Sequence, residues 1–315
     1  MIALPSPQQL RYLTTLADSR HFGRAALACS VTQSTLSAGI LTLERQLDAA
    51  ILDRTAGKHV VFTPLGLELV ERAGTALAAL EAVAEAANAA RTPMSGPLRL
   101  GVIPTIGPFL LPRLMPVLRH AFPRLRLFLR EDTTAHLVER LDTNRLDALL
   151  LALPCDCGDA DAAPVARDEF LVALPQGHPL AAQDRIPIAA LAGERLLLLE
   201  DGHCLRDQAL AVCGLLAGDR EGQDRFAATS LYTLVQMVAG GLGVTLLPRL
   251  AVAAGVTAGT DIELRPVAAA GAWRTLGVAW RPNAPRAPEY RSLVPLLSET
   301  YRDALASPQP QPGAK

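Results

Sequence analysis

Residues 26–55, ALACSVTQSTLSAGILTLERQLDAAILDRT, decide the fold of the first part of the chain. Apolar residues recur along this stretch at i, i+4, i+7 and i+11, namely Leu36, Ile40, Leu43 and Leu47. This spacing predicts a helix over about 34–47 with one buried stripe. Shorter helices are expected over 10–18 and 23–29, and the segment VTQS then forms a turn. Two helices joined this closely, with a polar start to the second, are typical of a helix-turn-helix that enters the major groove of DNA.

Polar residues at the start of this helix and off its buried stripe are the candidate DNA contacts. They are Thr32, Gln33, Ser34, Ser37 and Thr42. Gln33 and Ser37 are expected to contact either base edges or backbone phosphates. Residues 51–66, ILDRTAGKHVVFTPLG, alternate around the turn AGK, which predicts a two-stranded wing. Arg54 and Lys58 of the wing would point at phosphates, and such contacts are salt-dependent and carry no sequence information.

The overall composition is that of a globular protein. At 315 residues, of which 50 % are hydrophobic and 19 % charged, the chain is long enough for several domains, and its net charge of -1 indicates no particular partner. No basic region followed by an apolar one stands at the start, so we expect a cytoplasmic protein. Residues 226–248 are uncharged and long enough to cross a bilayer, but polar side chains and three glycines interrupt them. This pattern predicts a helix followed by a short strand.

The segments that follow predict a long helix and then alternating strands and helices. Residues 64–91 are Ala-rich and amphipathic after Pro64, and we expect a helix that pairs with a second copy of itself. A linker, TPMSGP, occupies 92–97. From Leu98 the pattern is strand, helix, strand, and the apolar run DALLLAL at 147–153 suits a strand buried on both faces. Units with parallel sheets are therefore expected.

Two thiols stand nine positions apart in residues 200–214, EDGHCLRDQALAVCG. If this segment is one helix, its rise of about 1.5 Å per residue puts the alpha carbons of Cys204 and Cys213 roughly 13 Å apart. A disulfide needs alpha carbons within about 7 Å, so a bond requires the helix to open. The pair is therefore either two small core residues or a switch whose oxidised form is refolded.

The remaining cysteines are expected to be reduced, because five cysteines without a secretion signal argue against a disulfide framework. Cys29 falls on the inner side of the helix-turn-helix and is expected in its core. The CDC motif at 155–157 predicts a loop with two spare thiols. A metal site formed with His178 or His203 is the alternative, and the lack of a second cysteine pair disfavours it.

The helix-turn-helix stretch, followed by VVFTPLG at 60–66, closely resembles the winged helix-turn-helix of the LysR-type transcriptional regulators, and the α/β remainder resembles their effector domain. Three segments are similar to the hydrogen-peroxide-sensing members of that family: IPTIGPFLLP at 103–112, EDGHCLRDQALAVC at 200–213 and RFAATSLYTLVQMVAGGLGVTLLP at 225–248. The resemblance covers residues 10–306. GHCLRDQ, with a second cysteine nine residues after the first, is its most specific motif.

The resemblance implies an α+β multidomain protein with a winged helix-turn-helix, a long dimerisation helix and a two-lobed α/β effector domain like the type II periplasmic binding proteins. The expected domains are a DNA-binding domain at 1–63, a dimerisation helix and hinge at 64–97, effector lobe I at 98–166 and 267–306, effector lobe II with the redox segment at 167–266, and a disordered tail at 307–315.

The resemblance also assigns a chemistry to the two cysteines. Hydrogen peroxide would oxidise Cys204 to a sulfenic acid, and Cys213 would then form an intramolecular disulfide with it that refolds the domain. The first step needs a thiolate, which the start of a helix favours. Arg206 would add to this effect, and Asp207 would oppose it unless it holds a water or helps protonate the leaving hydroxide. The peroxide-binding residues implied by the family pattern are Thr105, Thr134, His203, Asp207 and Arg274.

The family implies a regulator rather than an enzyme, with no cofactor, no metal and no membrane attachment. The expected partners are promoter DNA, hydrogen peroxide, a second copy in a homodimer that pairs into a tetramer, RNA polymerase, and a cellular dithiol reductant such as glutaredoxin or thioredoxin. The chain departs from the family at Ser34, which is commonly Pro, and at Ala38 and Gly39, which replace larger polar residues expected to face DNA. Gly39 is also expected to weaken its helix by up to about 1 kcal/mol relative to Ala.

Three other functions fit parts of the sequence. A regulator of the same family could bind a small organic acid between its lobes and keep its cysteines redox-silent. A thiol peroxidase or disulfide oxidoreductase would use the cysteines but would not need the N-terminal winged unit. A periplasmic solute-binding protein would share the two-lobed fold, but it would need a signal peptide and no DNA-binding head.

Overall fold

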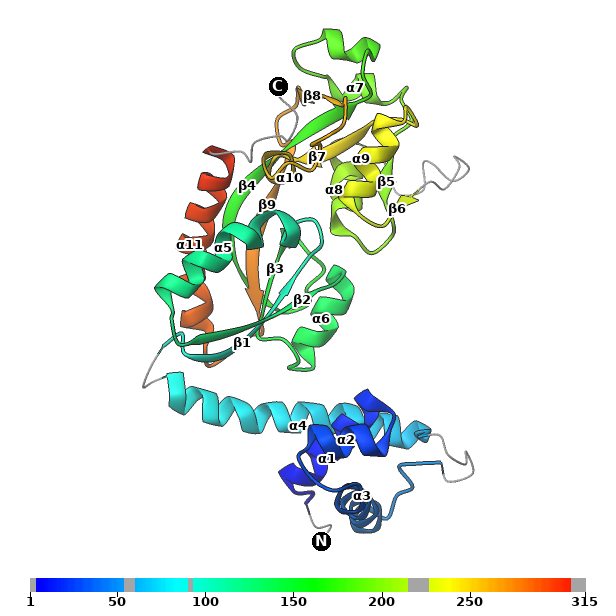
Figure 1. The fold of residues 1–315 in the computed structure, drawn as a ribbon, viewed down its shortest axis with the longest axis vertical. Coiled ribbons are helices and arrows are strands. Elements are labelled where there is room, and N and C mark those ends of the chain that lie inside the picture. The colour runs from blue at the N-terminus through cyan, green and yellow to red at the C-terminus, as the bar shows by residue number, and fades with distance from the viewer. Residues whose placement is uncertain (1–3, 54–59, 90–92, 215–226, 307–315) are drawn as a thin grey trace. The chain divides into compact units, whose positions relative to one another are not determined.

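The computed structural model describes residues 4–53, 60–89, 93–214 and 227–306. The chain divides into two compact units, residues 1–91 and 92–315 (Figure 1). The described helices of the first unit are α1 (Pro7–Ser19), α2 (Phe22–Ala28), α3 (Gln33–Leu47) and α4 (Pro64–Ala89). The three short helices lie where the sequence predicts them, within a few residues at each end.

The core of the first unit contains the predicted stripe of α3. Leu36, Ile40 and Leu43 are at most 2 % exposed, and Leu47 packs against them from a half-buried position. The opposing surface comes from α1, where Leu13 and Leu16 are fully buried. Cys29 is half-buried at the edge of this core. The period of 3.6 residues therefore predicted the buried face of α3 correctly.

The ends of these helices are set by local hydrogen bonds. Ser6 and Gln9 form a reciprocal capping box at the start of α1, because each side chain accepts a hydrogen bond from the backbone N–H of the other residue. Thr32 precedes α3, and its hydroxyl accepts from the N–H of Thr35. α4 begins at Pro64, where a helix tolerates a missing N–H.

The predicted wing is described only at its base. Leu52 and Phe62 form an antiparallel bridge, flanked by hydrogen bonds from the N–H of Asp53 to Val61 and from the N–H of Thr63 to Ile51. This pairing agrees with the alternating pattern of the sequence. The turn of the wing, with Arg54 and Lys58, lies outside the described residues.

The second unit is built on a seven-stranded sheet in the order β2-β1-β3-β9-β4-β7, with β8 paired to β4. The strands are β1 (Gly96–Val102), β2 (Leu125–Glu131), β3 (Ala148–Leu153), β4 (Asp161–Leu174), β7 (Thr245–Pro248), β8 (Glu263–Pro266) and β9 (Trp273–Trp280). β1 is parallel to β2 and β3, whereas β9 is antiparallel to β3 and β4. The prediction of parallel sheets is confirmed for β1, β2 and β3 but wrong for the pairs that involve β4, β7, β8 and β9. The chain returns from the second lobe in the opposite direction and inserts β9 between β3 and β4.

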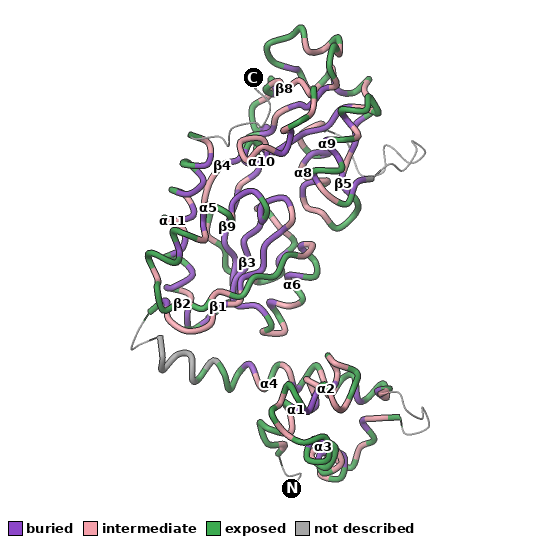
Figure 2. Tube along the Cα trace, in the orientation of Figure 1, coloured by how far each residue is buried: buried purple, intermediate pink, exposed green. Residues whose placement is uncertain are grey.

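Two strands define how the lobes are connected. The first part of β4, residues 161–169, pairs with β9, and its last part, residues 170–174, pairs with β7 and β8, so one strand contributes to both lobes. β3 lies in the interior of lobe I, and Ala148 to Ala152 are fully buried (Figure 2), as the run DALLLAL predicts.

The helices of the second unit cover this sheet and build the second lobe. They are α5 (Gly107–Ala121), α6 (Thr134–Asp142), a 3-10 turn (Pro179–Ala182), α7 (Ile188–Leu191), α8 (Cys204–Val212), α9 (Leu231–Ala239), α10 (Arg249–Ala253) and α11 (Ala287–Ala306). α5 packs against α11 (Figure 1). The apolar segment RLLLLE at 195–200 contains only the short strand β5 (Leu198–Leu199), which pairs in parallel with β6 (Ala227–Ala228).

The apolar stretch near residue 240 contains α9 and β7, separated by a turn at Gly240, Gly241 and Gly243, in agreement with the sequence. Among the described residues, no single helix is long and apolar enough to cross a membrane. Only α2 and α3 taken together, bent by 100° at their turn, pass that test of length and composition.

Cys155 and Cys157 form a disulfide in the loop between β3 and β4, with alpha carbons 5.3 Å apart. The expectation of two reduced thiols there is therefore wrong. The alternative metal site finds no support, because no group of three His, Cys, Asp or Glu side chains in the described ranges could hold a metal ion.

Gly39 has a packing role that the sequence does not reveal. A Cβ on this residue would lie 2.6 Å from Cδ2 of Tyr12, whose ring is buried in α1 and whose hydroxyl accepts a hydrogen bond from Gln8. Gly39 thus faces α1, and the expectation that it faces DNA is wrong. Its absent side chain allows α1 and α3 to approach each other closely.

We predict that Gly39→Ala destabilises the first unit by about 1–3 kcal/mol, although Ala is the better helix former, because overpacking against Tyr12 outweighs helix propensity. Gly74→Ala in α4 is the matched control, since a Cβ there would meet no atom within 4 Å and should stabilise the helix. Urea unfolding followed by circular dichroism measures both. Both tryptophans of the chain, Trp273 and Trp280, lie in β9, so tryptophan fluorescence reports separately on the second unit. A stabilising Gly39→Ala would show that the Tyr12 ring is not fixed.

Candidate functional site

The two cysteines stand at the two ends of α8. Gly202 adopts a positive φ of 92°, which favours glycine, and so turns the chain into the helix. His203 precedes the helix in an extended conformation, Cys204 is its first residue, and Cys213 follows its last. Both thiols are reduced and half-buried. The expected separation of the cysteines by one intact helix is therefore present, and the thiols cannot bond while α8 persists.

Cys204 opens into a pocket of about 510 Å³ where the lobes meet. The lining residues are Leu153, Pro154, Asp156, Ile188, Cys204, Asp207, Gln208, Ala211, Val212, Ala270, Gly271, Ala272, Trp273 and Arg274. Three of the predicted site residues, Cys204, Asp207 and Arg274, are brought together here. The other four, Thr105, Thr134, His203 and Cys213, are not among the residues that line this pocket.

Arg274 is the best-anchored side chain of the site. It is fully buried on β9 and forms an ion pair of 2.9 Å with Asp168, the residue opposite it on β4. Its remaining donors bind Thr105, with 2.8 Å from Nη1 to the hydroxyl oxygen and 2.9 Å from Nη2 to the carbonyl oxygen. Thr105 is 2 % exposed, and its hydroxyl accepts from Arg274, which leaves its own proton to donate.

Two further groups hold the Asp168 carboxylate. It accepts a hydrogen bond from the N–H of Leu250, at the start of α10, and the hydroxyl of Tyr301 in α11 shares its one proton between the Arg167 carbonyl at 2.8 Å and this carboxylate at 3.3 Å. Burial and the neighbouring Asp168 charge raise the pKa of Tyr301 far above its usual value, so this hydroxyl stays protonated and remains a donor. Every oxygen of the buried carboxylate is therefore satisfied, as a buried charge requires.

Thr134 and Gln208 have buried polar atoms without partners. The Thr134 hydroxyl and both amide atoms of Gln208 find no hydrogen bond among the described residues. Thr133, next to Thr134, lies against the turn before α8, since a Cβ on Gly202 would be 3.9 Å from its Cγ2. Unsatisfied buried groups are rare and indicate a place for a polar ligand or water.

Gln208 was missed by the sequence analysis. It stands four residues after Cys204, and residues at this spacing share one face of a helix. The i+4 spacing within the GHCLRDQ motif was the signal that could have identified it, because a side chain on that face lines any pocket that the thiol enters.

Arg206, which was expected to favour a thiolate at Cys204, contacts the segment that leads into α8. Its guanidinium pairs with Asp201 at 2.9 Å and donates to the carbonyl of Leu199 at 3.2 Å, so it is engaged with the segment that enters α8. Its positive charge is shared with the Asp201 carboxylate. The amides in the first turn of α8 also contribute positive potential near Cys204.

His203 is a neutral group in this site. Burial lowers its pKa below the usual 6.5, and the nearby Glu200 charge opposes this shift only in part. A neutral imidazole can accept one hydrogen bond and donate another, which suits a side chain beside a small polar ligand.

The predicted DNA contacts on α3 and at its start are exposed, whereas Arg54 and Lys58 lie outside the described residues. Thr32, Gln33, Ser34, Ser37 and Thr42 are exposed. The Thr42 hydroxyl donates to the carbonyl of Ala38 within α3, and the Thr32 hydroxyl caps the helix, so both are partly used by the protein. Gln33 and Ser37 have no such role and remain the better candidates for contacts with bases.

We predict that Arg274→Gln destabilises the second unit by about 3–5 kcal/mol, because it leaves the Asp168 charge buried without its partner. Arg249→Gln is the matched control: Arg249 pairs with Glu169, the neighbour of Asp168, but both side chains are about half exposed. Its loss should cost no more than about 1 kcal/mol. Urea unfolding followed by the fluorescence of Trp273 and Trp280 measures both variants. Equal losses would contradict the role assigned to burial.

We also predict a pH dependence of stability that comes from His203. Because its folded-state pKa is lowered, the unfolded state binds more protons just below pH 6.5, so stability is complete above 6.5 and is lost as the pH falls. His203→Gln removes this titration. When the pH is lowered from 7.5 to about 5.5, the unfolding midpoint of the native chain should fall relative to that of this variant. A difference that is independent of pH would mean that His203 is not desolvated.

Comparison with known proteins gives the same two-part organisation. Residues 7–67 match the bacterial regulatory helix-turn-helix protein of the lysR family, and residues 91–302 match the LysR substrate binding domain. The chain is 43 % identical over 292 residues to the DNA-binding transcriptional dual regulator OxyR of Escherichia coli K12. The aligned residues cover 91 % of this chain and 93 % of that protein. It is 39 % identical to the hydrogen peroxide-inducible genes activator of Haemophilus influenzae, over 95 % and 98 % of the two chains.

Solved structures agree. A full-length OxyR variant from Pseudomonas aeruginosa superposes with a TM-score of 0.74 at 37 % identity and covers 95 % of this chain and 98 % of its own. A hydrogen-peroxide-bound OxyR variant from Corynebacterium glutamicum gives a TM-score of 0.67 at 31 % identity, with 97 % and 95 % covered. The chain therefore belongs to the LysR-type transcriptional regulators, a family of DNA-binding regulators rather than enzymes, and within them it groups with the hydrogen peroxide-inducible genes activators.

Proposed function

We propose that this chain is a hydrogen-peroxide-sensing transcription regulator that activates antioxidant genes. The observation that carries the proposal is the arrangement of α8: two half-buried thiols stand at its opposite ends, and the first of them lines a pocket that also contains Arg274 and Gln208. Relatives named as hydrogen peroxide-inducible genes activators support the same function.

The chemistry proceeds in two steps. The Cys204 thiolate attacks one oxygen of hydrogen peroxide, the O–O bond breaks, and the products are a sulfenic acid and a hydroxide that takes up a proton. The Cys213 thiolate then attacks the sulfur of Cys204, the S–O bond breaks, and a second hydroxide leaves as the disulfide forms. Two thiols are thereby oxidised, and one peroxide is reduced to two waters.

The side chains proposed to bind the peroxide are the predicted Thr105, Thr134, His203, Asp207 and Arg274, together with Gln208. Thr105 donates its hydroxyl proton from a position fixed by Arg274, and Thr134 offers a buried hydroxyl that is otherwise unpaired. His203 is neutral and can donate or accept. Asp207 stands three residues after Cys204, exposed at the pocket, and is placed to help protonate the leaving hydroxide. Gln208 adds an amide whose atoms lack other partners.

The disulfide is the switch. Since Cys204 and Cys213 cannot be bonded across an intact α8, oxidation must unfold that helix and change the packing of the effector lobes. The proposed domains follow the boundaries at 1–63, 64–97, 98–166 with 267–306, 167–266 and 307–315. The dimerisation helix would pass the change to the DNA-binding heads.

Several partners belong to this proposal. The heads bind promoter DNA through Thr32, Gln33, Ser34, Ser37, Thr42 and the wing residues Arg54 and Lys58. The protein acts in the cytoplasm as a dimer of dimers and engages RNA polymerase. A cellular dithiol such as glutaredoxin or thioredoxin reduces the disulfide and resets the switch.

The pocket volume supports a second candidate function. At about 510 Å³ the pocket is far larger than a peroxide molecule and lies in the range of small-molecule sites, and Arg274 lines it. A regulator that binds a small organic acid there, with redox-silent cysteines, is the alternative.

Thiol trapping with intact-mass analysis of the reduced protein, titrated with substoichiometric peroxide, tests the proposal. We predict a rapid loss of two hydrogens that maps to a bond between Cys204 and Cys213, accompanied by loss of helical circular dichroism. Cys204→Ser should abolish the reaction, and Cys213→Ser should stop it at the sulfenic acid. Cys29→Ser, a thiol of the first unit, is the control and should react normally. Promoter binding is then compared in the two redox states.

Survival of both thiols in excess peroxide would overturn the proposal and leave the organic-acid regulator as the better account. That account predicts a ligand-induced rise in melting temperature that Cys204→Ser does not remove.

A further inference from the structure

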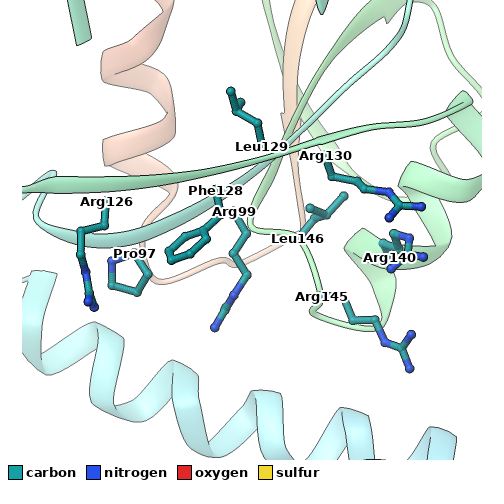
Figure 3. A pocket seen from close by; sticks show the side chains of 9 residues that line it. All are labelled: Pro97, Arg99, Arg126, Phe128, Leu129, Arg130, Arg140, Arg145 and Leu146. Atoms are coloured by element: carbon teal, nitrogen blue, oxygen red, sulfur yellow. The ribbon is translucent and has the colours of Figure 1, made fainter. Parts of the chain in front are cut away.

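A second pocket, of about 560 Å³, lies on the β1–β2 side of lobe I and shares no residue with the pocket at Cys204 (Figure 3). Its lining residues are Pro97, Arg99, Arg126, Phe128, Leu129, Arg130, Arg140, Arg145 and Leu146. They come from β1, from the edge strand β2, from α6 and from the loop that follows α6. Nothing in the proposed peroxide chemistry uses this pocket.

The lining carries five guanidinium groups and no carboxylate. Arg99 pairs with Asp147 at 3.6 Å and Arg130 with Asp132 at 2.8 Å at the pocket border. The guanidinium groups of Arg126 and Arg140 make no ion pair or hydrogen bond within the described residues. In a chain whose net charge is -1, this concentration of positive charge is local, and it lowers the free energy of any anion that enters.

Sheet geometry places an exposed aromatic ring among these charges. Side chains alternate along β2, so Arg126, Phe128 and Arg130 share one face, and Leu129 points away from them (Figure 3). The parallel register sets Arg99 of β1 beside Phe128. Phe128 is 56 % exposed although it is a large apolar side chain in a strand. Its ring therefore offers a stacking surface bordered by cations on three sides.

The apolar part of the pocket extends beyond the ring. Pro97 pairs in register with Arg126 on the neighbouring strand, and Leu146 lies on the side of α6. A simple inorganic anion would leave these surfaces uncovered. A ligand that fits the whole pocket combines an anionic group with a flat, weakly polar one, and a volume of this size is in the range of small-molecule sites.

We propose that this pocket binds a nucleoside polyphosphate. Guanidinium groups bind phosphate oxygens through paired hydrogen bonds, and the pocket offers them at both of its ends, from Arg126 on one side of Phe128 and from Arg140 and Arg145 on the other (Figure 3). The base stacks on Phe128, with Arg99 and Pro97 at its border. The site gives the regulator a second input that depends on nucleotide concentration and not on peroxide.

Isothermal titration of the full-length reduced protein with ATP, inorganic triphosphate and adenosine tests this proposal. We expect ATP to bind about tenfold or more tightly than either fragment, because only ATP provides both groups, and we expect its affinity to fall with added salt. The double variant Arg126→Ser/Arg140→Ser should weaken ATP binding by about tenfold or more. Phe128→Ser should lower the affinity for ATP to the affinity that the protein has for inorganic triphosphate.

The control is Arg119→Ser/Arg302→Ser, which removes the same charge from exposed positions on α5 and α11 and should leave ATP binding within about twofold. Unchanged binding in Arg126→Ser/Arg140→Ser would place the ATP elsewhere and overturn the proposal. Equal binding of ATP and triphosphate by the native chain would overturn the stacking on Phe128. Absence of binding at low salt would refute the site altogether.

Discussion

A fully buried ion pair between Asp168 and Arg274 is the constraint on which the effector unit depends. Burial of two charges costs several kcal/mol per ion unless hydrogen bonds satisfy the remaining donors and acceptors of both groups. The pair, whose members stand opposite each other on β4 and β9, meets this condition with groups from three other places: the loop after β1, the start of α10, and α11. The positions of these elements are therefore tied to one another, because moving any one of them would expose an unpaired buried charge.

Only the Arg274 side of the pocket at Cys204 is held in place by this buried network. Arg274 belongs both to the buried network and to the wall that faces α8. α8 itself rests against β5, a strand of two residues held by an equally short partner. The pocket thus has one wall that is costly to move and another that is held by few interactions. This asymmetry suits the proposed unfolding of α8 on oxidation.

Local patterns predicted the local structure well. The period of α3 identified its buried residues, the run at 147–153 identified a strand buried on both faces, and the spacing of Cys204 and Cys213 placed them at the two ends of one helix. The features that were missed depend on contacts between distant residues. β9 lies between β3 and β4 because of pairing over more than a hundred positions, and no local signal contains that information. Gly39 is explained by the ring of Tyr12, which belongs to another helix.

The site residues show the same division. The sequence motif located the thiols and Asp207, whereas the Arg274 partner Asp168 carries no motif and is recognised only by its burial. Gln208 lay within the motif, but its importance follows from two buried amide atoms that only the three-dimensional structure can show to lack partners.

The late position of β9 in the chain also affects biosynthesis. While residues 93–266 emerge from the ribosome, β3 and β4 cannot pair, because the strand that separates them has not yet been made. Lobe I therefore exposes two unpaired strand edges until residues 273–280 are available, whereas residues 4–89 already hold all the partners of their own core. The DNA-binding head can fold early during translation, whereas the sensing unit folds only after β9 has been made. We expect chaperones to bind its unpaired strand edges in the meantime.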